Sequence, residues 1–264
     1  MRLLSLLLAF RLVASTSVQA NTLQSAVTAV QPSTLLQQSL AALVGNTRLS
    51  DVTLTGTVRR VAGSDDETGT ATLKAITNGS ARIDLSLPSG LSSEISNLFA
   101  APSGVWSSAD GVSHPIALHN LLSEPAWFFP AFGIARRLSG MGFVTTVVGT
   151  ETHNGQTVQH ISVSQATSAQ VGLSGPALQH LTQIEFYLDP VSLLPVALGF
   201  NTHPDNNELL DIPAEVDFSD YRAVNGAQVP FHVQKSLNGS LNLDFQVETV
   251  TFNTGLSAST FSAH

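Results

Sequence analysis

Apolar residues recur at helical spacing in one clear stretch of the chain, residues 33–44. Its apolar positions, which lie near one face of a helix with 3.6 residues per turn, are Leu35, Leu36, Leu40, Leu43 and Val44. Ser33 is of a type that caps helix starts, and Gly45 is of the type that most often ends helices. The stretch therefore predicts an amphipathic helix that packs its apolar face against a sheet.

Beyond residue 50 the hydrophobic period changes to two, as in strands that bury one face. In residues 51–61, apolar side chains and Gly56 alternate with threonines and Arg59. The same alternation recurs in residues 81–87, 158–163, 183–188, 229–233 and 241–252. Between such runs lie the pairs Asn154-Gly155, Asn225-Gly226 and Asn238-Gly239, which suit two-residue type I′ hairpin turns. The pattern predicts a mainly β protein with a few helices, built as an antiparallel meander.

Two stretches break the alternation, and we interpret both as insertions between strands, where functional segments usually lie. Residues 201–213 are polar and rich in turn-forming residues. Residues 89–142 contain a helix-like run at 134–142 and, before it, a cluster of aromatic residues flanked by Pro125 and Pro130.

The aromatic cluster consists of Trp127, Phe128, Phe129 and Phe132, in a chain that is only 6% aromatic. Each such side chain carries roughly 150–250 Å², so together they exceed the roughly 300–600 Å² of the largest apolar patch on a typical monomer. One interpretation is that they fill one end of the protein's own core. The other is that they line or close a cavity for an apolar ligand, as a lid with hinges at Gly133, Gly140 and Gly142.

The N-terminus predicts export. Arg2, an apolar run and the closing residues Val18-Gln19-Ala20 are typical of a secretory signal peptide over residues 1–20. The apolar run is shorter than the roughly 20 residues of a membrane-spanning helix. We therefore expect residues 21–264 to form a single soluble domain, in the periplasm if the source has two membranes.

Charge and cysteine content exclude several classes of function. The net charge of −8 becomes −10 when Arg2 and Arg11 leave with the signal peptide, whereas nucleic-acid binding needs a basic face. The chain has no cysteine, which excludes disulfides, thiolate metal sites, a cysteine nucleophile and a lipid-bearing cysteine.

No catalytic or metal-binding motif is recognisable. Ser174 lies in GLSGP and lacks the G-x-S-x-G elbow of a nucleophile. The eight histidines form no H-E-x-x-H pair, and His160 and His232 are expected on the exposed faces of strands. Three acidic residues of the polar stretch lack the order of a calcium loop, and we expect them to be solvated: Asp205, Glu208 and Asp211. We therefore expect a non-enzymatic protein without a cofactor or a metal.

The order of these elements resembles the periplasmic lipoprotein-carrier superfamily, which includes the carrier that takes lipoproteins to the outer membrane, its receptor and an envelope-stress sensor. The resemblance covers most of residues 33–261. Its most similar pieces are YLDPVSLLPV at 187–196, DYRAVNGAQVPF at 220–231 and FNTGLSASTF at 252–261.

The resemblance implies a strongly curved antiparallel sheet, an incomplete β-barrel that wraps helices, although the strand patterns alone equally suit a β-sandwich. It also implies a carrier or binder of an apolar ligand, such as a lipid or a lipoprotein acyl chain. The chain has no clear counterpart to the arginine-bearing segment that latches the carrier's lid, and Arg82 is the nearest strand arginine. The alternative is an interaction or sensor module with a filled interior, whose partner is an envelope lipoprotein or a membrane-associated protein.

Overall fold

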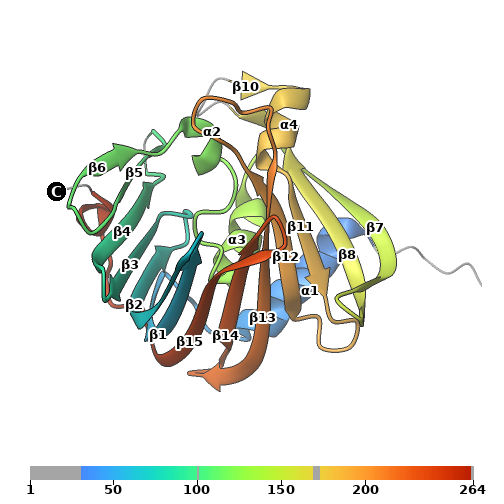
Figure 1. Cartoon of the computed structure of the whole chain (residues 1–264). Helices are drawn as coiled ribbons and strands as arrows, with labels where there is room; N and C mark the ends of the chain where they lie inside the picture. The colour runs from blue at the N-terminus through green and yellow to red at the C-terminus, as the bar shows by residue number, and fades with distance from the viewer. Residues whose placement is uncertain (1–30, 100, 169–172, 263–264) are drawn as a thin grey trace, which may run out of the picture.

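The computed structural model describes residues 31–99, 101–168 and 173–262 (Figure 1). The predicted signal peptide, residues 1–20, lies outside the described residues. Most described residues belong to one open antiparallel sheet of 13 strands. From one edge to the other, these strands are β6 (Ser113–Pro115), β5 (Ser103–Ser107), β4 (Gly90–Asn97), β3 (Ala81–Leu87), β2 (Asp65–Ile76), β1 (Asp51–Ala62), β15 (Ser240–Phe252), β14 (Ala227–Leu237), β13 (Ile212–Val224), β12 (Pro195–Thr202), β11 (Ile184–Leu188), β8 (Gln156–Gln165) and β7 (Phe143–His153).

The sheet curls around two of the helices, α1 (Pro32–Val44) and α3 (Pro130–Ser139), as Figure 1 shows. The remaining elements are short: α2 (Leu118–Leu121), α4 (Pro176–Thr182), the 3-10 turn η1 (Ala258–Phe261) and the paired strands β9 (Thr167–Ser168) and β10 (Leu173–Ser174). The predicted curved, open sheet around helices is confirmed. The β-sandwich alternative is wrong, because these strands form one continuous sheet. No helix in the described part of the chain is both long and apolar enough to cross a bilayer.

The predicted N-terminal helix is confirmed as α1, but its start differs from the expectation. The helix begins at Pro32, whose fixed φ suits the first turn, and its N-cap is Gln31. Ser33 therefore lies inside the first turn and does not cap it. Gly45 ends the helix with a positive φ of 54°, as predicted.

The three Asn-Gly pairs are hairpin turns. In each pair the asparagine has φ 48° and the glycine has φ between 72° and 89°, as both central residues of a type I′ turn require. The residues that flank them pair directly, for example Val224 with Ala227 and Leu237 with Ser240. Since these turns are two residues long, they fix the register of β7 with β8 and of β13 through β15.

The inner face of one half of the sheet becomes more polar toward the edge of the sheet. Adjacent strands β1 to β5 pair Leu54 with Leu73, Leu73 with Ile83, Ile83 with Glu94 and Glu94 with Trp106. Paired residues share a face, so this row runs from buried leucines at the centre to a carboxylate and an indole near the edge. The concave face is therefore apolar at the centre and polar at this edge.

The outer face of the same strands is covered by the C-terminal segment. Phe261 of η1 packs with Ile76 and Ile95 in a separate apolar cluster. Arg82 lies on this outer face, pairs with the Asp84 carboxylate at 2.8 Å and donates to the Thr260 carbonyl. The strand arginine singled out from the sequence is thus outside the curve of the sheet.

The stretch 89–142 is only partly an insertion. Residues 90–115 form β4, β5 and β6, which extend the main sheet at its edge. The serine-rich sequence hides this, because a strand with few apolar residues shows no hydrophobic alternation. The polar stretch, in contrast, supplies the predicted loop between β12 and β13.

Candidate functional site

The four aromatic residues singled out from the sequence lie inside the molecule. Trp127, Phe128, Phe129 and Phe132 are between 0% and 3% exposed and belong to the main hydrophobic cluster. The Phe129 and Phe132 rings meet edge to face at 4.8 Å, and the Trp127 and Phe128 rings do so at 5.6 Å. Of the four, Trp127 reaches the wall of a cavity.

Buried charges anchor this aromatic segment. Glu124 forms an ion pair with Arg137, and both side chains are 1% exposed. Arg137 also donates to the Gly133 carbonyl at 3.0 Å, and Arg136 donates to the Ser123 carbonyl at 3.1 Å. Burial, together with the nearby Arg137, lowers the pKa of Arg136 to about 10. A Cβ at Gly133 would lie 2.8 Å from the Glu124 carboxylate, so this glycine gives the ion pair room.

The cavity lies between the concave face of the sheet and the aromatic segment. It has two neighbouring lobes of about 240 and 310 Å³. The smaller lobe is lined by apolar side chains that include Ile83, Leu85 and Leu243, and the larger one reaches Asn120 of α2. The residues that line both lobes are Glu94, Trp106, Trp127, Lys235 and Asn242. Because the lobes share these residues, a ligand in one meets the same wall as a ligand in the other.

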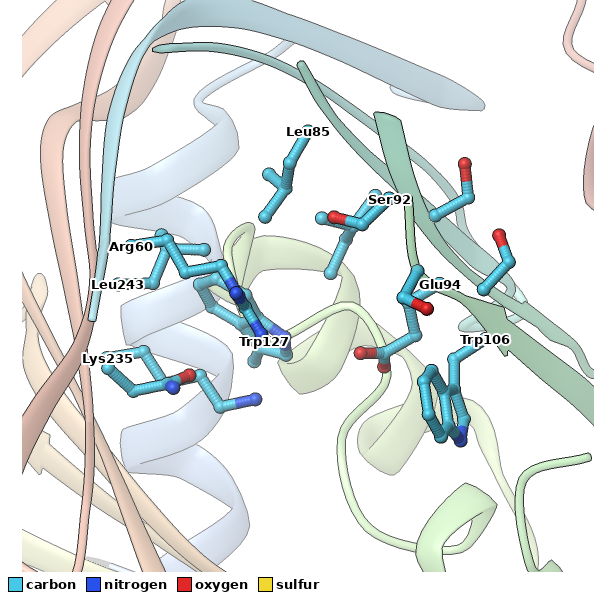
Figure 2. A pocket seen from close by; sticks show the side chains of 13 residues that line it. Arg60, Leu85, Ser92, Glu94, Trp106, Trp127, Lys235 and Leu243 are labelled. Atoms are coloured by element: carbon cyan, nitrogen blue, oxygen red, sulfur yellow. The ribbon is translucent and has the colours of Figure 1, made fainter. Parts of the chain in front are cut away.

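Charged side chains face each other across this cavity. In Figure 2, Lys235 and Arg60 lie on one side of Trp127, while Glu94 and Trp106 lie on the other. The Lys235 ammonium lies 4.9 Å from the centre of the Trp127 ring, within reach of a cation–π interaction. Burial lowers the pKa of Lys235, and the negative charge of Glu94 offsets part of this effect. Among the described residues, the ammonium has no salt-bridge partner.

The cavity residues other than Trp127 were missed by the sequence analysis, although a local signal existed for two of them. Lys235 continues the inward-facing positions Phe231 and Val233 of β14, and Arg60 follows Val58 on the inward face of β1. A charged residue at the end of a series of inward-facing apolar residues indicates that this end of the strand lines a cavity or the rim of a cavity. Glu94 and Trp106 had no such signal, because their strands were not recognised.

The strand histidines lie on the convex face, as predicted, but they are not freely exposed. His160 bonds to Glu185 at 2.7 Å and His232 bonds to Asp244 at 2.9 Å. Both rings are half-buried because these carboxylates and neighbouring strand residues cover them. The cavity itself is lined by serines and, among its described residues, by no histidine that would activate them.

Solved structures of low sequence identity share this architecture. A domain assigned to outer membrane lipoprotein sorting, from Vibrio parahaemolyticus, has a TM-score of 0.53 at 15% identity and covers 87% of this chain and 95% of its own. A LolA superfamily protein from Nitrosomonas europaea has a TM-score of 0.54 at 11% identity, with 89% and 99% covered. The chain has the lipoprotein-carrier fold. A DUF1329 family protein from Desulfovibrio piger has a TM-score of 0.53 at 11% identity, with 88% and 95% covered.

These identities establish the fold alone. No family model matches the chain by sequence, and no curated protein does. Within the lipoprotein-carrier fold, this chain has a cavity more polar than the apolar one that the resemblance implies. Lys235, Arg60 and Glu94 place charges where acyl-chain binding alone needs none.

Proposed function

We propose that this protein binds and carries an amphiphilic lipid, an acyl chain with an anionic headgroup, in the cavity beside Trp127. The observation that carries the proposal is the Lys235 ammonium, held against the Trp127 ring without a salt-bridge partner among the described residues. The lipoprotein-carrier fold supports the same class of ligand.

The apolar part of the cavity suits the acyl chain. Leu85 and Leu243 lie beside Trp127 in the smaller lobe, and each methylene removed from water contributes about 0.8 kcal/mol. Trp127 is the member of the aromatic cluster that contacts the ligand. The other three, Phe128, Phe129 and Phe132, are fully buried and support this wall from behind.

The charged part of the cavity suits an anionic headgroup. Partial burial of the Lys235 ammonium costs free energy and lowers its pKa, and an adjacent anion offsets this cost. Arg60 supplies a second positive charge on the same side, while Glu94 repels an anion from the opposite side. The headgroup therefore binds between Lys235 and Arg60, and the chain extends past Trp127.

We further propose that residues 1–20 are a cleaved signal peptide and that residues 21–264 act as one domain in the periplasm, without catalysis. The closing residues Val18-Gln19-Ala20 and the absence of a nucleophile–base pair in the described cavity lining support this assignment.

The first experiment is native mass spectrometry of residues 21–264 purified from their own envelope, before and after lipid extraction. An acyl species that co-purifies and disappears on extraction is the expected result. A protein without a ligand, which also takes up none from lipid vesicles, would refute carriage and favour the interaction or sensor module.

The headgroup is tested with the fluorescent lipid cis-parinaric acid and its uncharged methyl ester. Lys235→Met should weaken binding of the acid about tenfold, equivalent to about 1.4 kcal/mol, and leave binding of the ester unchanged. Lys74→Met is the matched control. Lys74 faces outward on β2, where it lies opposite Arg82 of the neighbouring strand β3. Equal binding of the acid by the Lys235→Met variant and the unmodified protein would refute the anionic headgroup while leaving acyl-chain binding intact.

A further inference from the structure

Two imidazoles and a carboxylate converge at the end of the molecule where α2 and α4 lie (Figure 1). His180 is in the last turn of α4, His203 directly follows β12, and Asp211 directly precedes β13. The Asp211 Oδ1 atom lies 2.9 Å from His180 Nε2 and 3.1 Å from His203 Nε2. We propose that His180, His203 and Asp211 form a binding site for a divalent transition metal ion, with Zn²⁺ as the best fit.

Two of the three distances between candidate ligand atoms are close to those of a tetrahedral site. Zinc binds imidazole nitrogen and carboxylate oxygen at about 2.0–2.2 Å, which puts neighbouring ligand atoms about 3.4 Å apart. The three candidate ligand atoms already lie within 4.8 Å of one another, and the two nitrogen–oxygen distances need to open by only a few tenths of an ångström. His180 and Asp211 are 38% and 40% exposed, so the site is open to an ion from solvent.

The buried histidine presents one ring nitrogen, Nε2, to the candidate site. The His203 side chain is 0% exposed, and its Nδ1 atom has no hydrogen-bond partner among the described residues. The only polar contact of the ring is therefore on the Nε2 side, toward Asp211 and His180.

The backbone around His203 is fixed without a metal. Asn120 of α2 accepts a hydrogen bond from the His203 N–H and donates one to the His203 carbonyl, both at 2.8 Å. His119 contacts the Pro204 carbonyl at 3.1 Å and packs edge-on against the His203 ring. An apolar cluster holds α2 and α4 together: Leu122, Leu178 and Leu181. A site built on such fixed elements loses little entropy when the ion binds.

The kinds of ligand atom indicate the metal. Two nitrogens and one oxygen suit zinc and other first-row transition ions, whereas Ca²⁺ takes six to eight oxygens. Three protein ligands leave a fourth position for water. A bound ion would connect α4 to the loop between β12 and β13. Asp205 of this loop and Thr202, the last residue of β12, line the larger lobe of the cavity. Metal binding would thus stiffen the rim of the cavity.

A second group, His153 with Glu215 and Asp217, is less suited to a metal. Asn154 donates to both carboxylates, at 2.8 Å and 3.2 Å, so they already have a partner. This group supplies the control, since His153→Ala changes a histidine–carboxylate contact elsewhere on the molecule.

The experiment uses residues 21–264 freed of metal with EDTA and titrated with ZnCl₂ by calorimetry, with thermal unfolding in parallel. We expect one high-affinity Zn²⁺ per chain and a higher Tm with Zn²⁺. His180→Ala and Asp211→Asn change half-exposed residues and should each weaken binding at least tenfold and remove most of the Tm shift. His153→Ala should bind as the unmodified protein does. Absence of binding, or unchanged binding by both the His180→Ala and Asp211→Asn variants, would overturn the site.

Discussion

Glu124→Gln should destabilise the protein severely, because it removes the negative charge that compensates the buried Arg137 and the half-buried Arg136. Glu124 and Arg137 are each 1% exposed, and Arg136 is close enough that the Glu124 charge raises its pKa against the effect of burial. Glutamine keeps the shape of the side chain, removes its charge and replaces one acceptor oxygen with an NH2 donor. The variant therefore tests electrostatics in the core and not packing.

The expected loss is about 3–5 kcal/mol, the range for removing one partner of a buried ion pair and leaving the other charge uncompensated. This is a large share of the roughly 5–15 kcal/mol that stabilises a typical domain. The double variant Glu124→Gln with Arg137→Met removes the stranded charge as well. It should recover much of the loss, since replacing both partners of a buried pair is often nearly neutral.

Urea unfolding, followed by tryptophan fluorescence and by circular dichroism, measures these differences as shifts of the midpoint at constant slope. The matched control is Asp66→Asn, which breaks the Arg59–Asp66 pair on the surface, where both side chains are 50% exposed. Solvent screens that pair, so its loss should leave the midpoint nearly unchanged. The reasoning is refuted if Glu124→Gln is as mild as Asp66→Asn, or if the double variant is no more stable than Glu124→Gln.

Two further substitutions test the fold. Burial would raise the pKa of Asp51, but hydrogen bonds from Thr254, Gly255 and Ser50 outweigh it and hold that pKa below its ordinary value. The contribution of these hydrogen bonds to stability is present above pH 4 and is lost as the pH falls through the folded-state pKa of Asp51. Asp51→Asn should therefore cost about 1–3 kcal/mol at pH 7. The cost should become progressively smaller below about pH 4. Urea midpoints across pH check this, and a cost that stays constant to pH 2 would contradict it. Gly56→Ala places a Cβ 1.9 Å from the Gln246 carbonyl oxygen and should cost at least about 2 kcal/mol. Thermal unfolding measures this loss, with Gly63→Ala as the control. A Cβ at residue 63 has no neighbour within 4 Å, although φ there is +62°. A smaller loss of stability at residue 56 than at residue 63 would be inconsistent with the packing at Gly56.

Part of the secondary structure could be predicted from the sequence, because its causes are local. Alternation fixes which side chains of β1, β3, β11, β14 and β15 face the core, whatever strand lies beside them. The Asn-Gly pairs determine their turns because asparagine and glycine are the residues that adopt positive φ at low cost. Gly45 ends α1 for the same kind of reason, whereas the start of α1 at Pro32 was not predicted.

The candidate sites depended on the tertiary structure, since residues distant in sequence meet there. Lys235 and Glu94 face one cavity only because the sheet curves, so that β4 near one edge faces β14 near the middle of the sheet. His180, His203 and Asp211 show no metal-ligand spacing in the sequence, yet α4 and two strand ends bring them together.

The sequence by itself thus determined α1, the strands that alternate apolar and polar residues together with their inward faces, and the concentration of aromatic residues before α3. Only the tertiary structure decided that the polar residues 90–115 extend the sheet, because an edge strand is held by backbone pairing and needs no apolar alternation of its own. It also decided that three of the four aromatic side chains fill the core while Trp127 reaches the cavity. That division depends on which strands lie opposite the segment, and strand neighbours are set by register across the whole sheet.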